Sequence, residues 1–80
     1  MDTYNEIKNR IFQLLEINDL SIHALAIKSG VAPSTIKNIL YGKSKNPGIV
    51  TLKLICEGLN ISLFDFFNTD IFRSTELEKD

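Results

Sequence analysis

The polar side chains that could do chemistry gather in the middle of the chain, where four of them recur at the spacing of one helix face. These four are Ser34, Lys37, Asn38 and Tyr41. At about 100° per residue they point one way, whereas Ile36, Ile39 and Leu40 point the other. An ammonium, an amide and two hydroxyl groups can all donate hydrogen bonds. Such a face is suited to lie against the acceptor-rich surface of a nucleic acid.

Charge is distributed unevenly along the 80 residues. The net charge of −1 argues, taken alone, against binding to nucleic acid. Residues 20–56, however, contain five lysines and no acidic residue, a net charge of +5, whereas residues 1–19 carry −2 and residues 57–80 carry −4. The five are Lys28, Lys37, Lys43, Lys45 and Lys53. A local positive field is what phosphate binding needs, and the average over the chain conceals it.

Few residues favour an enzyme or a metalloprotein. His23 is the only histidine and Cys56 the only cysteine, so we expect no metal site and no disulfide within the chain. A catalytic thiol would need a base beside it, and no glycine-rich phosphate loop is present. We therefore expect no catalytic residue and no cofactor. A lone cysteine fits a reducing cytosol, and we expect a cytoplasmic protein with neither a secretory signal nor a membrane span.

Helical periodicity and cap residues predict an all-α fold with no strand. The expected helices cover residues 3–17, 22–29, 33–41, 49–59 and 63–67. Thr3, with Glu6 three residues later, predicts a capping box for the first helix, and Ser21 and Ser62 are predicted caps for the second and fifth. Gly30 is expected to supply the left-handed residue that closes the second helix.

A set of residues between Ile7 and Phe67 has a spacing that is typical of one family. The set is Leu20-Ser21, Leu25-Ala26, Gly30-Val31, Ser34-Thr35-Ile36, Gly42, Asn46-Pro47, Leu52, Ile55, Leu59 and Ile61-Ser62-Leu63. With these residues the chain resembles the Cro/C1-type (XRE-family, lambda-repressor-like) helix-turn-helix DNA-binding domains. The resemblance implies a compact five-helix bundle whose third helix enters the major groove of double-stranded DNA. We expect one domain over residues 1–70 and a C-terminal tail over residues 71–80, the end of which is mobile.

In this family, bases are read from the start and outer face of the third helix. Carried over residue by residue, the base-contacting positions are Pro33, Ser34, Lys37 and Asn38. Lysine suits guanine O6 and N7, and asparagine suits adenine N6 and N7, with a good pair worth about 1–3 kcal/mol of discrimination. The resemblance also implies phosphate contacts from the start of the second helix, from the third helix and from the loop that follows it. These are Ser21, His23, Thr35, Tyr41, Lys43, Ser44, Lys45 and Asn46.

Three positions depart from the family pattern. Ile22 stands where the family commonly has a glutamine that binds phosphate, and its side chain cannot make that hydrogen bond. Ala32 and Pro33 stand where the family often has a cap and its first polar base reader. Pro33 can still contact a thymine methyl group. The predicted base readout is therefore narrower than usual.

The C-terminal region contains more aromatic surface than one short helix can bury. Its predicted dimer patch consists of Phe64, Phe67, Ile71 and Phe72, with internal packing of these side chains as the alternative. Family members bind pseudo-palindromic sites as dimers, with recognition helices about 34 Å apart. The resemblance therefore implies a homodimer on DNA.

The sequence leaves two functions open. The first is a sequence-specific transcriptional regulator, a small repressor of phage or mobile-element type that occludes a promoter. The alternative is a protein-interaction module of the same fold, such as an antitoxin or the partner of an antirepressor, in which DNA contact is secondary. The acid-free lysine segment favours the regulator, and the narrow base readout and aromatic C-terminus favour the module. Neither function needs a small-molecule substrate.

Overall fold

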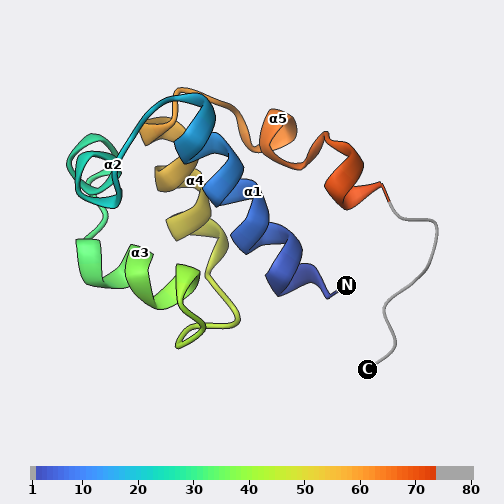
Figure 1. Ribbon diagram of the computed structural model, residues 1–80, viewed down its shortest axis with the longest axis horizontal. Coiled ribbons are helices and arrows are strands. Elements are labelled where there is room, and N and C mark those ends of the chain that lie inside the picture. The colour runs from blue at the N-terminus through green and yellow to red at the C-terminus, as the bar shows by residue number, and fades with distance from the viewer. Residues whose placement is uncertain (1, 74–80) are drawn as a thin grey trace.

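The computed structural model describes residues 2–73, and all of their regular secondary structure is helical (Figure 1). They are α1 (Thr3–Ile17), α2 (Ile22–Ser29), α3 (Pro33–Leu40), α4 (Ile49–Gly58), α5 (Leu63–Phe67) and the 3-10 turn η1 (Asp70–Phe72). The predicted all-α fold is confirmed, and each predicted end of the five α-helices lies within one residue of the observed one. None of the helices in this range is long and apolar enough to cross a bilayer.

One hydrophobic core joins the five α-helices. Its most deeply buried side chains are Ile11, Leu25, Ile36, Ile39, Ile55, Cys56 and Phe66. Figure 1 shows α1 crossing the middle of the bundle, with α2 and α3 at one side and α5 and η1 at the other. The helices with the most extensive contact are α2 and α4. A Cβ atom on Gly58 of α4 would lie 2.8 Å from Cβ and 2.9 Å from Cα of Ser29 in α2, so this approach requires glycine.

Local cap residues set the ends of α2 and α5 as predicted. Ser21 Oγ accepts a hydrogen bond from the N–H of Ala24, and Ser62 Oγ accepts one from the N–H of Asp65, both at 3.0 Å. Gly30 ends α2 with a φ of 72°, the left-handed conformation that costs glycine little. The turn between α2 and α3 is therefore specified by adjacent residues.

The predicted capping box at Thr3 is wrong. Thr3 is already the first helical residue, and Asp2 is the N-cap, with its carboxylate accepting a hydrogen bond from the N–H of Asn5 at 2.8 Å. Aspartate caps at least as well as threonine, and its charge also interacts favourably with the helix dipole. The stronger cap, one residue earlier, therefore begins the helix.

Arg10 is a buried cation that joins α1 to α5. Its Nε donates to the carbonyl of Phe66 at 2.7 Å, and its Nη2 donates to the carbonyl of Asp65 at 2.9 Å. Its Nη1 donates to Oε1 of Gln13 at 2.8 Å. The two carbonyls belong to the last turn of α5, where backbone acceptors lack partners within the helix. Arg10 thus satisfies the end of a five-residue helix and fastens it to the bundle.

Three of the C-terminal phenylalanine rings contact one another. The ring centroid of Phe67 lies 4.9 Å from those of Phe66 and Phe72, in edge-to-face arrangements. Phe67 and Phe72 also pack against the core, and Ile71 is half-buried. In the predicted dimer patch, only Phe64 keeps most of its side chain in solvent, 72%. Internal packing therefore uses much of the apolar surface assigned to that patch.

The described start of the predicted tail lies against the bundle. η1 contacts α1, and Phe72 within it packs on the core. Residues 74–80, where the mobile end of the tail was predicted, lie outside the described residues.

Candidate nucleic-acid interface

The outer face of α3 carries all four predicted base-contacting residues in solvent. Pro33, Ser34, Lys37 and Asn38 are exposed. On the opposite side, Ile36, Ile39 and Leu40 retain 0%, 1% and 3% exposure, so α3 is anchored by its apolar face. The amphipathic pattern read from the sequence therefore corresponds to the actual burial of the helix.

Contacts from outside α3 fix the position of its C-terminal end. The hydroxyl of Tyr4, in α1, donates a hydrogen bond to the carbonyl of Ile39 at 2.7 Å. The N–H of Ser44 donates to the carbonyl of Asn38 at 2.9 Å, which folds the following loop back onto the helix. The sequence places Tyr4 on the core face of α1, and its positioning role arises only because α3 packs there.

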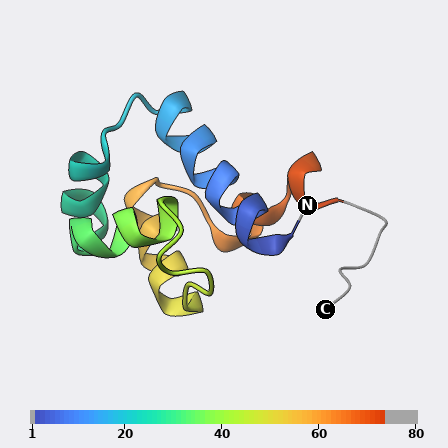
Figure 2. The same cartoon turned by 60° about the horizontal axis from the view of Figure 1, so that its bottom comes forward.

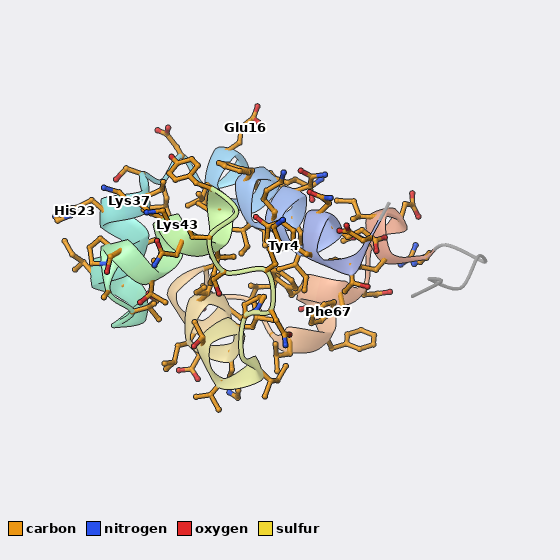
Figure 3. The ribbon with its side chains drawn as sticks, turned by 90° about the horizontal axis from the view of Figure 1, so that it is seen from below. Tyr4, Glu16, His23, Lys37, Lys43 and Phe67 are labelled. Carbon is orange, nitrogen blue, oxygen red and sulfur yellow. The ribbon has the colours of Figure 1, made fainter. Side chains whose placement is uncertain are left out.

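The predicted phosphate-contacting residues surround this face from three segments. Thr35 and Tyr41 are exposed at α3. In the loop that follows α3, Ser44 is half-buried, and Lys43, Lys45 and Asn46 are exposed. Figure 3 shows His23, Lys37 and Lys43 at one end of the molecule, with Phe67 toward the other. The structure therefore brings the start of α2, α3 and the loop to one end.

Ser21 already has a structural role, because its Oγ accepts the capping bond of α2. Its hydroxyl hydrogen can still donate to a phosphate oxygen, since a hydroxyl both accepts and donates. The side chain is exposed, as is His23 in the first turn of α2. Both remain geometrically available to an anion.

Four lysines on this part of the protein have no anionic partner within residues 2–73. They are Lys28, Lys37, Lys43 and Lys45. Lys53 differs, because its Nζ lies 3.1 Å from Oε1 of Glu57 on the same helix. The charge of Lys53 is thus partly neutralised, and the local positive field depends mainly on the other four.

Two helices that border this surface begin without a side-chain cap. α3 begins after Ala32 and α4 after Gly48, and neither residue supplies a capping hydrogen bond. By contrast, side chains cap α1, α2 and α5. Free N–H groups at a helix N-terminus, together with the helix dipole, favour phosphate. The uncapped start of α3 was predicted from Ala32, whereas that of α4 was not.

Cys56 is not placed for chemistry. It is 1% exposed on the core face of α4, and burial raises the pKa of its thiol, although the charges of Arg10 and Lys53 oppose this effect. A buried neutral thiol is a poor nucleophile. Among residues 2–73, no three histidine, cysteine or acidic side chains come together in a way that could hold a metal ion.

Comparison with known proteins agrees with this geometry. A family model described as helix-turn-helix matches residues 11–66, which include α2, α3 and the helices that support them. The chain belongs to the Cro/C1-type (XRE) helix-turn-helix family. It is a DNA-binding domain of the transcription-regulator type.

One curated relative of this helix-turn-helix domain is the uncharacterized HTH-type transcriptional regulator YvzC of Bacillus subtilis (strain 168). The two chains are 29% identical over 63 residues, which cover 79% of this chain and 80% of the relative. No solved structure matches the chain significantly. The family match covers α2, the turn and α3, which form the helix-turn-helix of this domain.

Proposed function

We propose that this helix-turn-helix domain is a small repressor of phage or mobile-element type that recognises a specific pseudo-palindromic operator. The observation that supports this most directly is the exposed polar face of α3, which is anchored through buried Ile36 and Ile39. A rigid helix with polar donors on one side fits the major groove, where each base pair presents a distinct pattern of acceptors and donors.

Base recognition is assigned to the first two turns of α3. Lys37 would donate to guanine O6 or N7, and Asn38 would form a two-bond contact with adenine N6 and N7. Ser34 would donate to an adjacent base, and Pro33 would contact a thymine methyl group. Because Ala32 and Pro33 offer no side-chain hydrogen bond, discrimination rests mainly on Lys37 and Asn38.

Phosphate contacts would set the orientation of α3 in the groove. Lys43 and Lys45 would neutralise phosphates on one strand, with Ser44 and Asn46 beside them, and Thr35 and Tyr41 would border the groove. The start of α2, at Ser21 and His23, would contact the other side. The four lysines without ion pairs make such contacts favourable, because they lose no protein partner when they bind.

A pseudo-palindromic operator requires two copies of α3 about 34 Å apart, which implies a homodimer on DNA. Binding of two half-sites together would also compensate for the narrow readout of each, because the second contact is effectively intramolecular. Occupation of such a site within a promoter in the cytoplasm would exclude RNA polymerase. Repression by occlusion needs no ligand-sensing step.

The direct test is selection of bound duplexes from a randomised library at two salt concentrations. The proposal expects an enriched palindrome whose binding falls steeply as salt rises. On that duplex, Lys37→Ala and Asn38→Ala should each weaken binding by about 1–3 kcal/mol and relax the preference at one base pair. Arg73→Ala is the control, since that exposed cation pairs with Asp70 in η1, on the other side of the bundle from α3 (Figure 1). Binding with no enriched sequence would contradict the assignment of α3 as a reader.

A second candidate function, a protein-interaction module of the same fold, is favoured by the exposed Phe64 and by the narrow readout. In that case Lys37→Ala and Asn38→Ala would leave binding to the protein partner unchanged. The same two variants therefore separate the candidates.

A further inference from the structure

The start of α3 presents two exposed side chains that contain no hydrogen-bonding group, Ala32 and Pro33. We call these two residues the apolar pair. Pro33 also lacks a backbone N–H, and the N–H of Thr35 donates to the carbonyl of Ala32 at 3.0 Å. The exposed polar face of α3 begins only at the next residue, Ser34. At this end of α3, the side chains therefore offer a base only aliphatic carbon.

The apolar pair is held firmly by the residues on either side of it. Val31, immediately before it, is 8% exposed, and Ile36, about one turn after it, is 0% exposed. The ring of Pro33 fixes its own φ, so little side-chain freedom is lost on contact. Figure 2 shows α2 and the start of α3 at the left edge of the molecule, with no other helix outside them. The pair is thus anchored by the core and open to a ligand.

The major groove of DNA offers one apolar group to such a surface, the C5-methyl group of a pyrimidine. The other groups on the base edges are hydrogen-bond donors or acceptors. Any of them would lose its hydrogen bond to water against Ala32 and Pro33 and gain no partner in return, which is unfavourable. A methyl group loses no hydrogen bond in the same contact and gains from leaving water. It is therefore the group in the groove that fits the apolar pair.

Two pyrimidines carry this methyl group in the same place. Thymine has it beside the O4 acceptor, and 5-methylcytosine has it beside the N4 donor. Distinguishing these two bases requires a donor or an acceptor on the protein, and the side chains of Ala32 and Pro33 have neither. Cytosine and uracil lack the methyl group and leave the apolar pair without its contact. The chemistry of the pair thus separates bases by the methyl group alone.

We propose that the apolar pair reads the C5-methyl group itself, so that it accepts both thymine and 5-methylcytosine and disfavours cytosine. Methylation of a cytosine at this base pair would then increase the occupancy of the operator. The inference rests on the proposed function, because it assumes that α3 lies in the major groove of a specific operator. It deepens that function by naming a DNA modification to which binding responds.

The test changes single bases in the duplex that the library selection enriches. Replacing each thymine of the half-site in turn with uracil removes only a methyl group and locates the base pair at which that group matters. At this base pair, uracil and thymine are compared opposite adenine, and cytosine and 5-methylcytosine opposite guanine. In both comparisons the methyl group should raise the affinity of the wild-type chain about fourfold, the effect of burying one methyl group.

A duplex with 5-hydroxymethylcytosine separates direct contact from an effect of the methyl group on the shape of the DNA. Its C5 substituent is at least as large as a methyl group but ends in a hydroxyl, which would lose water against Pro33. Binding should therefore be at least about threefold weaker than to 5-methylcytosine. An effect that acts through the shape of the duplex would give similar binding to both bases.

The variant Pro33→Ser tests the residue that makes the contact. It places a hydroxyl where the ring was and should reduce the methyl effect from about fourfold to less than about twofold. Asn38→Ala is the matched control, because Asn38 is another exposed residue of α3. It should weaken binding and keep the fourfold methyl effect. Circular dichroism checks that both variants fold, and the comparisons of bases use the wild-type chain and need neither variant.

Three results would overturn the inference. The first is a selected half-site in which no thymine shows a methyl effect above about 1.5-fold, or which contains no thymine on either strand. The second is equal binding to 5-methylcytosine and 5-hydroxymethylcytosine, and the third is a methyl effect that a folded Pro33→Ser leaves unchanged. An enriched operator without a methyl effect would remove only this inference, whereas a library without any enriched sequence would also remove the function on which it rests.

Discussion

Replacing Gly58 with alanine has two opposing effects on the stability of the protein, one on helix α4 itself and one on its packing against α2. The structure indicates which effect is larger. Gly58 is the last residue of α4, and alanine is favoured over glycine in a helix by up to about 1 kcal/mol. Helix propensity alone therefore predicts a more stable protein.

The packing of α4 on α2 predicts the opposite. A Cβ at position 58 would lie 2.8 Å from Cβ, 2.9 Å from Cα and 2.9 Å from the backbone nitrogen of Ser29. Two of these three atoms are backbone, so no side-chain rotation relieves the contact and α2 must move. Overpacking of this kind costs about 1–3 kcal/mol, and this case belongs at the upper end. After the gain in propensity is subtracted, Gly58→Ala should destabilise the protein by about 1–2 kcal/mol.

Thermal unfolding followed by circular dichroism measures this effect. In a domain of this size, 1 kcal/mol corresponds to about 4–8 °C, so the midpoint should fall by roughly 5–15 °C. Glu57→Ala is the control at the adjacent exposed position, and it should change stability by no more than about 0.5 kcal/mol. A Gly58→Ala midpoint at or above that of the wild type would refute the reasoning, because it would mean that α2 yields without cost.

Three further expectations follow from single contacts. Arg10→Met should lower the free energy of unfolding, measured in urea, by about 2–4 kcal/mol, because it leaves the carbonyls of Asp65 and Phe66 without their donors. A change below about 1 kcal/mol would contradict the role of Arg10 in fastening α5 to the bundle. Burial raises the pKa of the Cys56 thiol in the folded protein, so stability is retained below the pKa of the unfolded thiol and lost above it. The free energy of unfolding of the wild type should therefore fall relative to that of Cys56→Ala as the pH rises beyond about 8.5. Parallel profiles of unfolding free energy against pH for the two proteins would contradict this expectation. Lys45→Ala should make the slope of log affinity against log salt shallower by about 0.9, equally on specific and nonspecific duplexes; an unchanged slope would place Lys45 away from phosphate.

The sequence by itself determined the helices, because their signals are local. Ser21 and Ser62 cap their helices within three residues, and Gly30 ends α2 through its own backbone conformation. The polar face of α3 was equally predictable, since the spacing of Lys37 and Asn38 places them opposite the buried isoleucines whatever the helix packs against. Even the wrong cap at Thr3 was displaced by only one residue, because Asp2 competes for the same N–H groups.

The tertiary structure alone decided which side chains lose solvent and what they contact. Arg10 reads in the sequence as an ordinary surface charge of α1, and it is buried only because α5 brings its last carbonyls there, more than fifty residues later. Phe67 and Phe72 could have faced a partner, but η1 folds back and pairs their rings. The exposure of α4 depends equally on the arrangement of the other helices, which cover one side of α4 and leave Val50 in solvent. Helix caps and helical periodicity depend on neighbours in the chain. Burial depends on which distant segment packs against a residue, and no local sequence pattern specifies that segment.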